Sequence, residues 1–399
     1  MAAGRAGELG RSVLLVEKNP ILGKKLLITG NGRCNLTNNK PDLRTMLAKY
    51  KGNDKFLFSA FSQFGVEDTL DFFSRRGMAT KEEAEGRVFP ASGKAQTVLD
   101  VLAGYMKEGG VEIHTNCVVG GLWVDAAGSA TKHIRIRLKD RTELRTRSCV
   151  VATGGTARPE SGSTGDGFAW LAKMGHTIIK DGVALVPIAL KDAWAKKLTG
   201  VALTGIKLTT FQNKEKQDVG EGELLFTHFG ISGPTVLDMS REIGELLKYG
   251  EVTVTLDMFP RFDHDALGRK FQALLNSQSN KKLKNTMSRL VPLALVPAIL
   301  QLAHVNGEIP SHSTRREDRI KLVSLMKGIP LNVKGLLGVD KAAISSGGVV
   351  LEELNFKTMQ SRLVPNLFIV GDLLNIDRPS GGYSLQLCWT TGFVAGSNS

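Results

Sequence analysis

The feature that most constrains this chain is a set of three short apolar runs, each followed by an acid or by a glycine turn. They cover residues 12–17, 148–152 and 367–370. The first two runs are short, apolar and rich in β-branched residues, which is typical of buried strands in a parallel sheet, and the third run is also predicted to be a strand. Open α/β sheets bind ligands beyond the carboxyl ends of such strands. The sequence therefore predicts an α/β protein with a ligand site at that edge of its sheet.

Other segments complete an α/β pattern and then depart from it. Apolar spacing predicts helices over 66–76, 95–108 and 166–175, strands over 111–114 and 117–124, and a half-exposed antiparallel strand over 133–139. From about residue 186 the chain becomes rich in strands, and over 262–303 and 317–327 it becomes helical. After residue 342 it is again β-like. We therefore expect an α/β domain interrupted by a long insertion, part β and part helical.

Composition narrows the function classes. The net charge is +13, but the lysines and arginines are scattered and no nucleic-acid-binding motif accompanies them. We therefore expect an anionic cofactor and no nucleic-acid partner. Apolar stretches are too short for a membrane span, and residues 1–9 lack the apolar core of a signal peptide.

The cysteines and histidines offer little chemistry of their own. Cys34, Cys117, Cys149 and Cys388 are far apart, which argues against a zinc site or a disulfide framework and favours a cytoplasmic location. No metal cluster, acid pair or Ser-His-Asp set has convincing spacing. His228 is the histidine to watch, and we favour a structural role for it over a catalytic one.

The first candidate binding residue is Glu17, at the end of the first apolar run. An acid there hydrogen-bonds ribose hydroxyls in dinucleotide-binding units, although a surface acid at a strand end is an equal alternative. Such units open with a strand and a G-x-G-x-x-G loop. Here Gly4, Gly7 and Gly10 have a different spacing and no strand precedes them. We expect them to lie where the first helix ends.

Three further segments concentrate ligand-facing groups. Residues 19–38 are dense in Gly, Asn and Lys, which supply close backbone approach, donors and positive charge. Residues 148–155 form a strand that ends in Thr-Gly-Gly. Residues 366–396 combine a strand, Gly-Asp and a Gly-Gly turn at a helix start, where backbone N–H groups can meet an anion or a carbonyl.

Together these segments resemble the aminoacetone oxidase-like family of FAD-binding proteins, distant relatives of the fumarate reductase and succinate dehydrogenase flavoproteins. The resemblance rests on residues 12–38, 150–168, 224–234 and 366–386. It implies a discontinuous Rossmann-like FAD-binding domain over 1–187 and 341–399, with an inserted β-barrel and helical region over 188–340. It also implies an FAD-dependent oxidoreductase that binds its flavin noncovalently and acts on a small organic substrate. Whether NAD(P)H donates the electrons is left open.

The resemblance also assigns cofactor contacts. Glu17 and Lys18 would hold the adenosine ribose, and Val119 would contact the adenine through its backbone. Asp372, after Gly371, would bind the ribityl or pyrophosphate region. The remaining candidates are Lys24, Lys25, Gly32, Arg33, Cys34 and Asn35 near the flavin and pyrophosphate, Thr153, Gly154 and Gly155 along the cofactor, and Gly381, Gly382, Tyr383, Ser384, Leu385 and Gln386 against the flavin ring.

The family pattern begins with a strand and a glycine loop, whereas this chain starts within the helix that follows, so we expect an N-terminally truncated member. Two functions stay open. The chain is either an FAD-dependent oxidoreductase or a truncated or degenerate relative that binds FAD weakly and serves as a non-catalytic binding protein. The residues identify no catalytic base and no oligomeric state.

Overall fold

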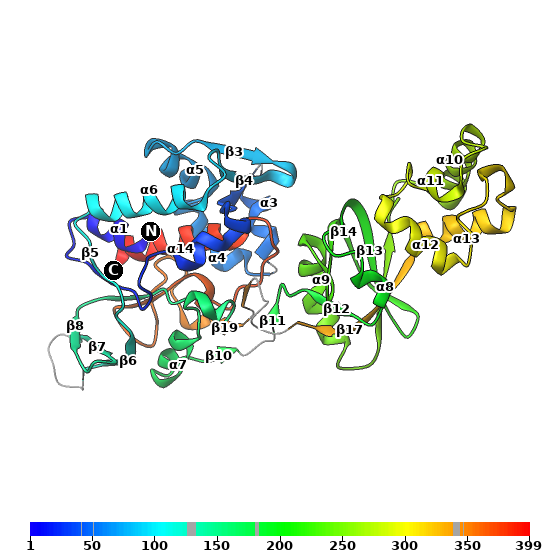
Figure 1. Cartoon of the computed structure of the whole chain (residues 1–399). Helices are drawn as coiled ribbons and strands as arrows, with labels where there is room; N and C mark the ends of the chain where they lie inside the picture. Colours follow the sequence, from blue (N-terminus) through cyan, green and yellow to red (C-terminus); the bar gives the residue numbers. More distant parts are fainter. Residues whose placement is uncertain (41, 51, 126–132, 180–182, 338–343, 346) are drawn as a thin grey trace. The chain divides into compact units, whose positions relative to one another are not determined.

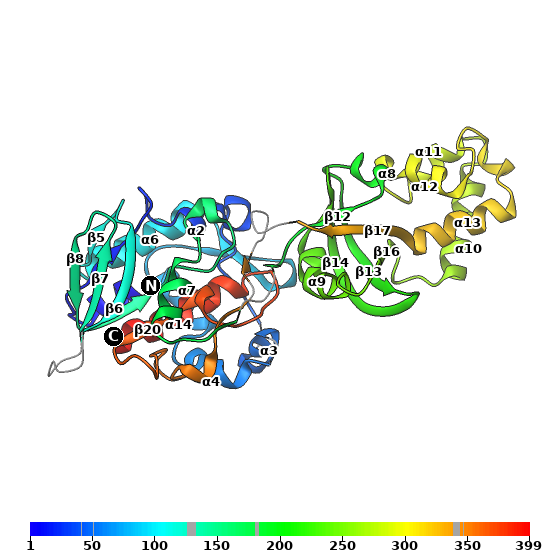
Figure 2. The same ribbon diagram turned by 90° about the horizontal axis from the view of Figure 1, so that it is seen from below.

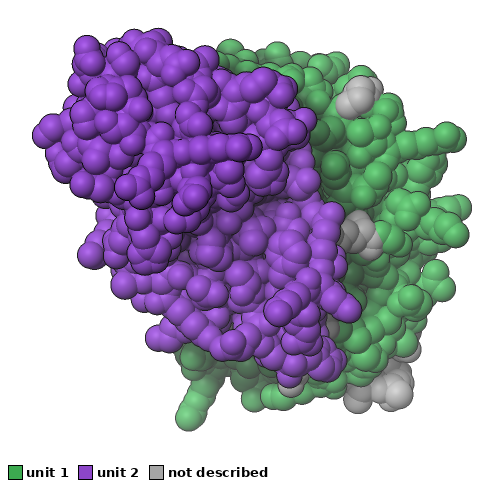
Figure 3. Space-filling model, turned by 90° about the vertical axis from the view of Figure 1, so that its right-hand side faces the viewer, with its two compact units in different colours: residues 1–183, 342–399 green, residues 184–341 purple. Residues whose placement is uncertain are grey.

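The computed structural model describes residues 1–40, 42–50, 52–125, 133–179, 183–337, 344–345 and 347–399. The chain divides into two compact units, coloured separately in Figure 3. Unit 1 comprises Met1–Val183 and Ala342–Ser399, and unit 2 comprises Ala184–Lys341. The predicted α/β class, with an inserted barrel and helical region, is confirmed.

The three apolar runs form the strands β1 (Leu14–Val16), β9 (Cys149–Val151) and β20 (Leu367–Ile369). β1 pairs in parallel with β5 (Glu112–His114), and β20 pairs in parallel with β9. β20 is fully buried, whereas β9, which was predicted to be a buried strand, is fully buried only at Val151. β1 was also predicted to be a buried strand, but it is not fully buried, since Leu14 is 38% exposed.

The helix α14 (Tyr383–Asn398) runs through unit 1 and packs against α1 (Ala2–Glu8) and α4 (Asp54–Gln63), as Figure 1 shows. The contact with α1 is very close, since a Cβ on Gly396 would lie 2.3 Å from the carbonyl oxygen of Ala2. α1 in turn packs on α6 (Ala95–Glu108), whose bounds match the predicted helix. The N-terminal glycines therefore belong to a helix and its end, as expected.

Unit 1 also contains two small antiparallel sheets of three strands each. One contains β6 (Val119–Val124), β7 (Ile134–Leu138) and β8 (Glu143–Thr146), which lie side by side in Figure 2. The other has the order β2 (Thr37–Asn38), β4 (Arg87–Pro90) and β3 (Thr80–Glu83). The other elements of unit 1 are α2 (Lys24–Ile28), α3 (Leu43–Leu47), α5 (Val66–Arg75), α7 (Asp166–Lys173), and the short pair β10 (Ile178–Ile179) with β19 (Gly348–Val349).

Unit 2 is built on a closed barrel with strand order β12-β15-β14-β13-β16-β17. Alternate residues of β16 are buried, as expected for a strand with one face toward a core. The helix α9 (Pro234–Leu246) packs on the barrel, while α10 (His264–Ser277) packs against α13 (Arg316–Lys327). The other bounds are β12 (Ile188–Leu190), β13 (Ala202–Gln212), β14 (Glu215–Thr227), β15 (Gly230–Ser232), β16 (Val252–Asp257), β17 (Ile329–Leu336), α8 (Ala193–Lys196), α11 (Leu283–Met287) and α12 (Val296–Ala303). Among the described helices, none combines the length and the apolar character that a membrane crossing requires.

Candidate functional site

A buried ionic cluster lies directly beyond the carboxyl end of β20. Asp372 accepts hydrogen bonds from Lys25 Nζ, at 3.3 Å, and from the guanidinium of Arg378. The Arg378 side chain is only 1% exposed and also donates to the carbonyl of Ile376, at 2.7 Å, and to Ser384 Oγ, at 3.1 Å. The cluster thus joins α2, β20 and the start of α14.

The electrostatics of this cluster favour an anion. Burial alone would raise the pKa of Asp372, but the nearby charges of Arg378 and Lys25 outweigh it and hold that pKa below its ordinary value. Two cations against one carboxylate leave an excess of positive charge. Arg378 was missed in the sequence. The one available signal was an arginine between an acid and a Gly-Gly turn.

A second group of polar residues follows β1. One carboxylate oxygen of Glu17 accepts hydrogen bonds from the backbone and side-chain amides of Asn19, both at 2.8 Å. Its other oxygen has no hydrogen bond in the structure as described. Lys18 binds Asp166 at 2.8 Å, which ties the end of β1 to the start of α7. Burial would raise the pKa of Asp166, but hydrogen bonds from Lys18 and Thr164 lower it overall.

The strand β9 ends in a glycine turn that packs against α7. Gly154 has a φ of +72°, a conformation that favours glycine. A Cβ on Gly167 of α7 would lie 2.2 Å from Thr153 Oγ1. The amide of Gly165 donates to the carbonyl of Gly155 at 3.2 Å. The predicted Thr-Gly-Gly segment is therefore held at the carboxyl edge of the sheet by the first turn of a helix.

The Asn-rich segment lies against the Gly-Gly turn, although the two are far apart in sequence. The amide of Asn38 donates to the carbonyl of Gly381 at 2.9 Å. Asn35, oriented so that its nitrogen donates to the carbonyls of Thr37 and Val88, accepts from the N–H of Gly382 at 3.1 Å. Asn38 Oδ1 is buried and has no hydrogen-bond partner, so one acceptor is left unsatisfied where the Asn-rich segment contacts the Gly-Gly turn.

Some predicted residues have structural partners instead. Gln386 is fully buried and bonds Thr37, Thr69, Thr390 and the carbonyl of Gly65. Tyr383 is buried, and Leu385 packs on a core cluster beside Cys34. Burial raises the pKa of Cys34 to about 12, so the thiol stays protonated near neutral pH.

Others lie apart from the ionic cluster. Arg33 binds Glu83 at 3.0 Å and stacks over Phe89, Lys24 is exposed, and Gly32 is exposed with a φ of +81°. Val119 begins β6 and pairs with Leu138. His228 is exposed in the turn between β14 and β15, where its ring contacts Phe229. Among the described residues, no group of three or more His, Cys, Asp or Glu side chains could hold a metal ion.

FAD fits the groups that the structure brings together in unit 1. Lys25 and Arg378 can bind a pyrophosphate, because both are cations and Arg378 presents several donors. The open oxygen of Glu17 suits a ribose hydroxyl, and the orphan acceptor on Asn38 suits an N–H donor of a flavin ring. These groups are of the kind that FAD-binding flavoproteins present to their cofactor.

The chain belongs to the HI0933-like family, since the model of the HI0933-like protein Rossmann domain matches residues 1–398. It is 32% identical over 386 residues to a 3-dehydro-bile acid delta(4,6)-reductase of Clostridium scindens, covering 96% of this chain and 91% of that protein. It is 29% identical over 392 residues to a ribosomal RNA dihydrouridine synthase of Escherichia coli, covering 98% and 92%.

Solved structures share the fold. The 3-ketosteroid delta1-dehydrogenase of Sterolibacterium denitrificans aligns with a TM-score of 0.54 and 14% identity, covering 99% of this chain and 96% of that one. The E. coli quinol fumarate reductase FrdA aligns with a TM-score of 0.51 and 14% identity, covering 99% and 67%. The chain is therefore an FAD-dependent oxidoreductase, as predicted.

Proposed function

We propose that this protein reduces a carbon–carbon double bond conjugated to a carbonyl group. The names of its relatives carry the proposal. A delta(4,6)-reductase acts on ring double bonds of a 3-dehydro steroid, and a dihydrouridine synthase forms a uracil ring saturated at its conjugated double bond. Two relatives with different substrates thus share one bond type. The narrower resemblance to aminoacetone oxidase-like proteins stays a prediction.

The residues of unit 1 would bind and orient the cofactor for this reaction. FAD, when bound, supplies the hydride, and NAD(P)H is the proposed source of its two electrons. Glu17 would fix the adenosine ribose, while Lys25 and Arg378 would neutralise the pyrophosphate. Asp372 would hold both cations in place between binding events. In the Gly381-Gly382 turn the N–H of Gly382 already donates to Asn35, so the N–H of Gly381 would be the one offered to the flavin ring.

The test has two stages. The full chain is loaded with FAD and desalted, and the retained flavin is measured by absorbance. The loaded protein is then given NAD(P)H with a conjugated 3-keto steroid or with uridine-containing ribosomal RNA. We expect retained flavin and substrate-dependent oxidation of NAD(P)H. Arg378→Met should lose flavin, whereas Arg75→Met, at an exposed ion pair, should not.

The two stages separate the possible failures. A chain that retains no flavin would support the alternative of a non-catalytic relative. Retained flavin without turnover on either substrate, when dithionite shows that the flavin can be reduced, would contradict the double-bond proposal. Equal flavin retention by wild type and Arg378→Met would remove the ionic cluster from the cofactor site.

A specific observation favours RNA as the substrate, contrary to our prediction from the scattered charge. Residues 258–328 hold twelve Lys and Arg against five Asp and Glu. Two segments of this region are joined by hydrogen bonds from Leu283 N and Lys284 N to the carbonyls of Ile309 and Gly307. They carry the basic tip, which we define as the exposed residues Lys281, Lys282, His312, Arg315 and Arg316.

A cluster of like charges attracts a polyanion, with an affinity that falls as salt rises. If RNA docks on the basic tip, Arg315→Glu combined with Arg316→Glu should weaken RNA binding and flatten its salt dependence, while leaving steroid turnover and flavin retention unchanged. Arg261→Glu with Arg269→Glu, outside the tip, is the matched control. RNA binding that is equally reduced by both pairs would show nonspecific attraction and would favour the steroid-like substrate.

A further inference from the structure

A cavity of about 540 Å³ in unit 1 lies beside the strand β6. Residues 120–124 of β6 line it from one side, together with Arg137 of β7. Its other lining residues are Trp170 and Lys173 of α7, Met174 at the end of that helix, and Val364. None of these residues belongs to the predicted cofactor set, so the cavity is a separate feature of unit 1.

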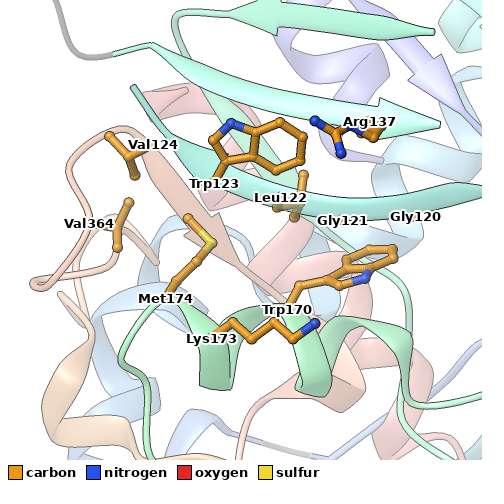
Figure 4. A pocket seen from close by; sticks show the side chains of 10 residues that line it. All are labelled: Gly120, Gly121, Leu122, Trp123, Val124, Arg137, Trp170, Lys173, Met174 and Val364. Carbon is orange, nitrogen blue, oxygen red and sulfur yellow. The ribbon is translucent and has the colours of Figure 1, made fainter. Parts of the chain in front are cut away.

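The cavity follows one edge of the β6-β7-β8 sheet. The buried Leu122 belongs to a core cluster against which Trp170 packs. Side chains alternate along a strand, so Trp123 points to the opposite face, and Figure 4 shows the two indoles on either side of β6. Among the described residues, β8 contributes none to the lining. A cavity lined from both faces must therefore pass around the free edge of β6, and we call it the β6 groove.

The backbone at this edge has unused hydrogen-bonding groups. Within the described part of the chain, β6 pairs only with β7. The amide of Asp125 donates to the carbonyl of His133 at 3.0 Å, and bonded pairs alternate with non-bonded pairs along antiparallel strands. Leu122 and Val124 are therefore in non-bonded pairs, and their N–H and C=O groups point away from β7 into the groove. No described residue forms a hydrogen bond with these groups.

The central part of this edge has no feature that would keep another strand away. Natural edge strands are usually protected by charged side chains, prolines or bulges. A bulge lies at the start of β6, between Val119 and Gly121, but residues 122–124 that follow it are Leu-Trp-Val. The opposite edge strand β8, in contrast, exposes the charged side chains of Glu143 and Arg145. The β6 edge is thus the one that can accept a further strand.

The groove offers apolar surface to the side chains of such a strand. A residue placed beside Leu122 or Val124 points to the same face of the sheet as they do, which is the face toward α7. Met174 and Trp170 pack against the same core cluster and line the groove there. An apolar side chain of an added strand would therefore be buried against the end of α7.

The charge at the groove favours a partner of opposite sign over a second copy of this chain. Lys173 is exposed in the last turn of α7, and its ammonium has no hydrogen bond or ion pair to any part of the chain that the structure describes. Arg137 lies over the Trp123 ring, 4.8 Å from its centroid, and none of the described lining residues is acidic. Two β6 edges paired together would bring these cations close to one another, and a β8 edge would add Arg145. Like charges placed together oppose both arrangements.

We propose that β6 is an interaction edge, at which an extended acidic segment of a partner protein adds a fourth strand to the β6-β7-β8 sheet. Its backbone would bond the free N–H and C=O groups of Leu122 and Val124. An apolar and an acidic side chain, two residues apart, would lie in the β6 groove, with the acid at Lys173. In strand addition the backbone bonds supply affinity and the side-chain contacts supply specificity. The proposal uses no cofactor-binding residue and does not rest on the reaction proposed above.

The experiment measures peptide binding to the full FAD-loaded chain by fluorescence anisotropy. The probe is a blocked peptide, Thr-Val-Thr-Glu-Thr, that carries an uncharged dye, and its counterpart has lysine in place of glutamate. We expect saturable binding of the acidic peptide and roughly tenfold weaker binding, or none, of the lysine peptide, because a like charge replaces an ion pair. Lys173→Glu should reverse this preference. Lys107→Glu should not, since Lys107 is exposed in the last turn of α6 as Lys173 is in α7.

Val124→Pro tests the backbone bonds. Proline at this position removes an N–H that faces the groove and leaves the bonds to β7 in place, so binding should weaken while flavin retention does not change. Lys173→Glu alters only an exposed side chain, so it tests the site even if Val124→Pro does not fold. The proposal is overturned if the two peptides bind alike, if neither binds at about 1 mM, or if Lys173→Glu and Lys107→Glu behave alike. Self-association of the chain that Val124→Pro abolishes would overturn the acidic partner in favour of a second copy.

Discussion

The buried ionic cluster makes a quantitative prediction for Asp372→Asn. The substitution removes the carboxylate that neutralises Arg378, whose side chain is almost fully buried. Removing one partner of a buried ion pair costs about 3–5 kcal/mol. Asparagine keeps one oxygen for Arg378, and Lys25 is exposed enough to turn toward water, so we expect about 3 kcal/mol. For a unit of this size the loss corresponds to a fall in Tm of about 6–12 °C.

The assay is urea and thermal unfolding of the flavin-free chain, followed by circular dichroism at pH 7. The exposed pair of Asp71 with Arg75 is the control, and Asp71→Asn should cost less than about 0.5 kcal/mol. Combining Asp372→Asn with Arg378→Met should recover most of the loss, because no buried charge then lacks a partner. The reasoning is refuted if Asp372→Asn costs no more than Asp71→Asn, or if the double variant is less stable than the single one.

Three further predictions concern other parts of unit 1. Burial alone would raise the pKa of Glu353, but hydrogen bonds from Thr177 and His176 outweigh burial and lower that pKa. The stability that these bonds contribute is present above the pKa of the unfolded state, and it is lost as the pH falls through the pKa of the folded state. Glu353→Gln should therefore cost about 1–2 kcal/mol at pH 7, and urea midpoints should converge with wild type in acid; a constant difference from pH 7 to pH 2 would contradict this. Gly382→Val should destabilise the protein by more than about 3 kcal/mol, because φ is +104° and a Cβ would lie 2.4 Å from the carbonyl oxygen of Thr37. Gly268→Ala in α10 is the control, and it should be neutral or stabilising because there is open space around that glycine. Similar unfolding midpoints for the two variants would be inconsistent with backbone strain at Gly382. Cys34, fully buried and with a pKa of about 12, should resist maleimide at pH 7.5 until urea unfolds the chain, as followed by mass spectrometry, and rapid labelling of the native protein would show that the segment opens.

Local patterns were sufficient for the strands and helices with a strong apolar signal. The bounds of the strand β20 and of the helix α6 were predicted to within about one residue. This was possible because the strand is a run of consecutive apolar residues and the helix has apolar residues at helical spacing. The exposure of β1 was not predictable in this way. The apolar content of Leu14–Val16 indicates a strand, whereas its burial depends on which strands pair with it.

The candidate site was only partly readable, because its contacts join residues far apart in sequence. Asp372 was identified from its place after a strand, but its partner Lys25 is 347 positions away. The network of His176, Glu353 and Ser361 had no signal in the sequence at all. Its hydrogen bonds resemble those of a hydrolase triad. However, Ser361 is buried and its Oγ accepts hydrogen bonds from the backbone amides of Leu363 and Val364, so the network has a structural role.

The way unit 2 is closed has a consequence for the modularity of the chain. Its first and last barrel strands, β12 and β17, pair with each other, and Ile188 lies opposite Leu336. The chain therefore enters the barrel at Ile188 and leaves it at Leu336, about 5 Å apart. Once unit 2 is folded, the entropic cost of closing the insertion within unit 1 is therefore as small as that of a short hairpin loop. A hairpin turn of roughly two to five residues between the two segments of unit 1 could replace the insertion, and other domains with adjacent termini could be grafted there without refolding unit 1.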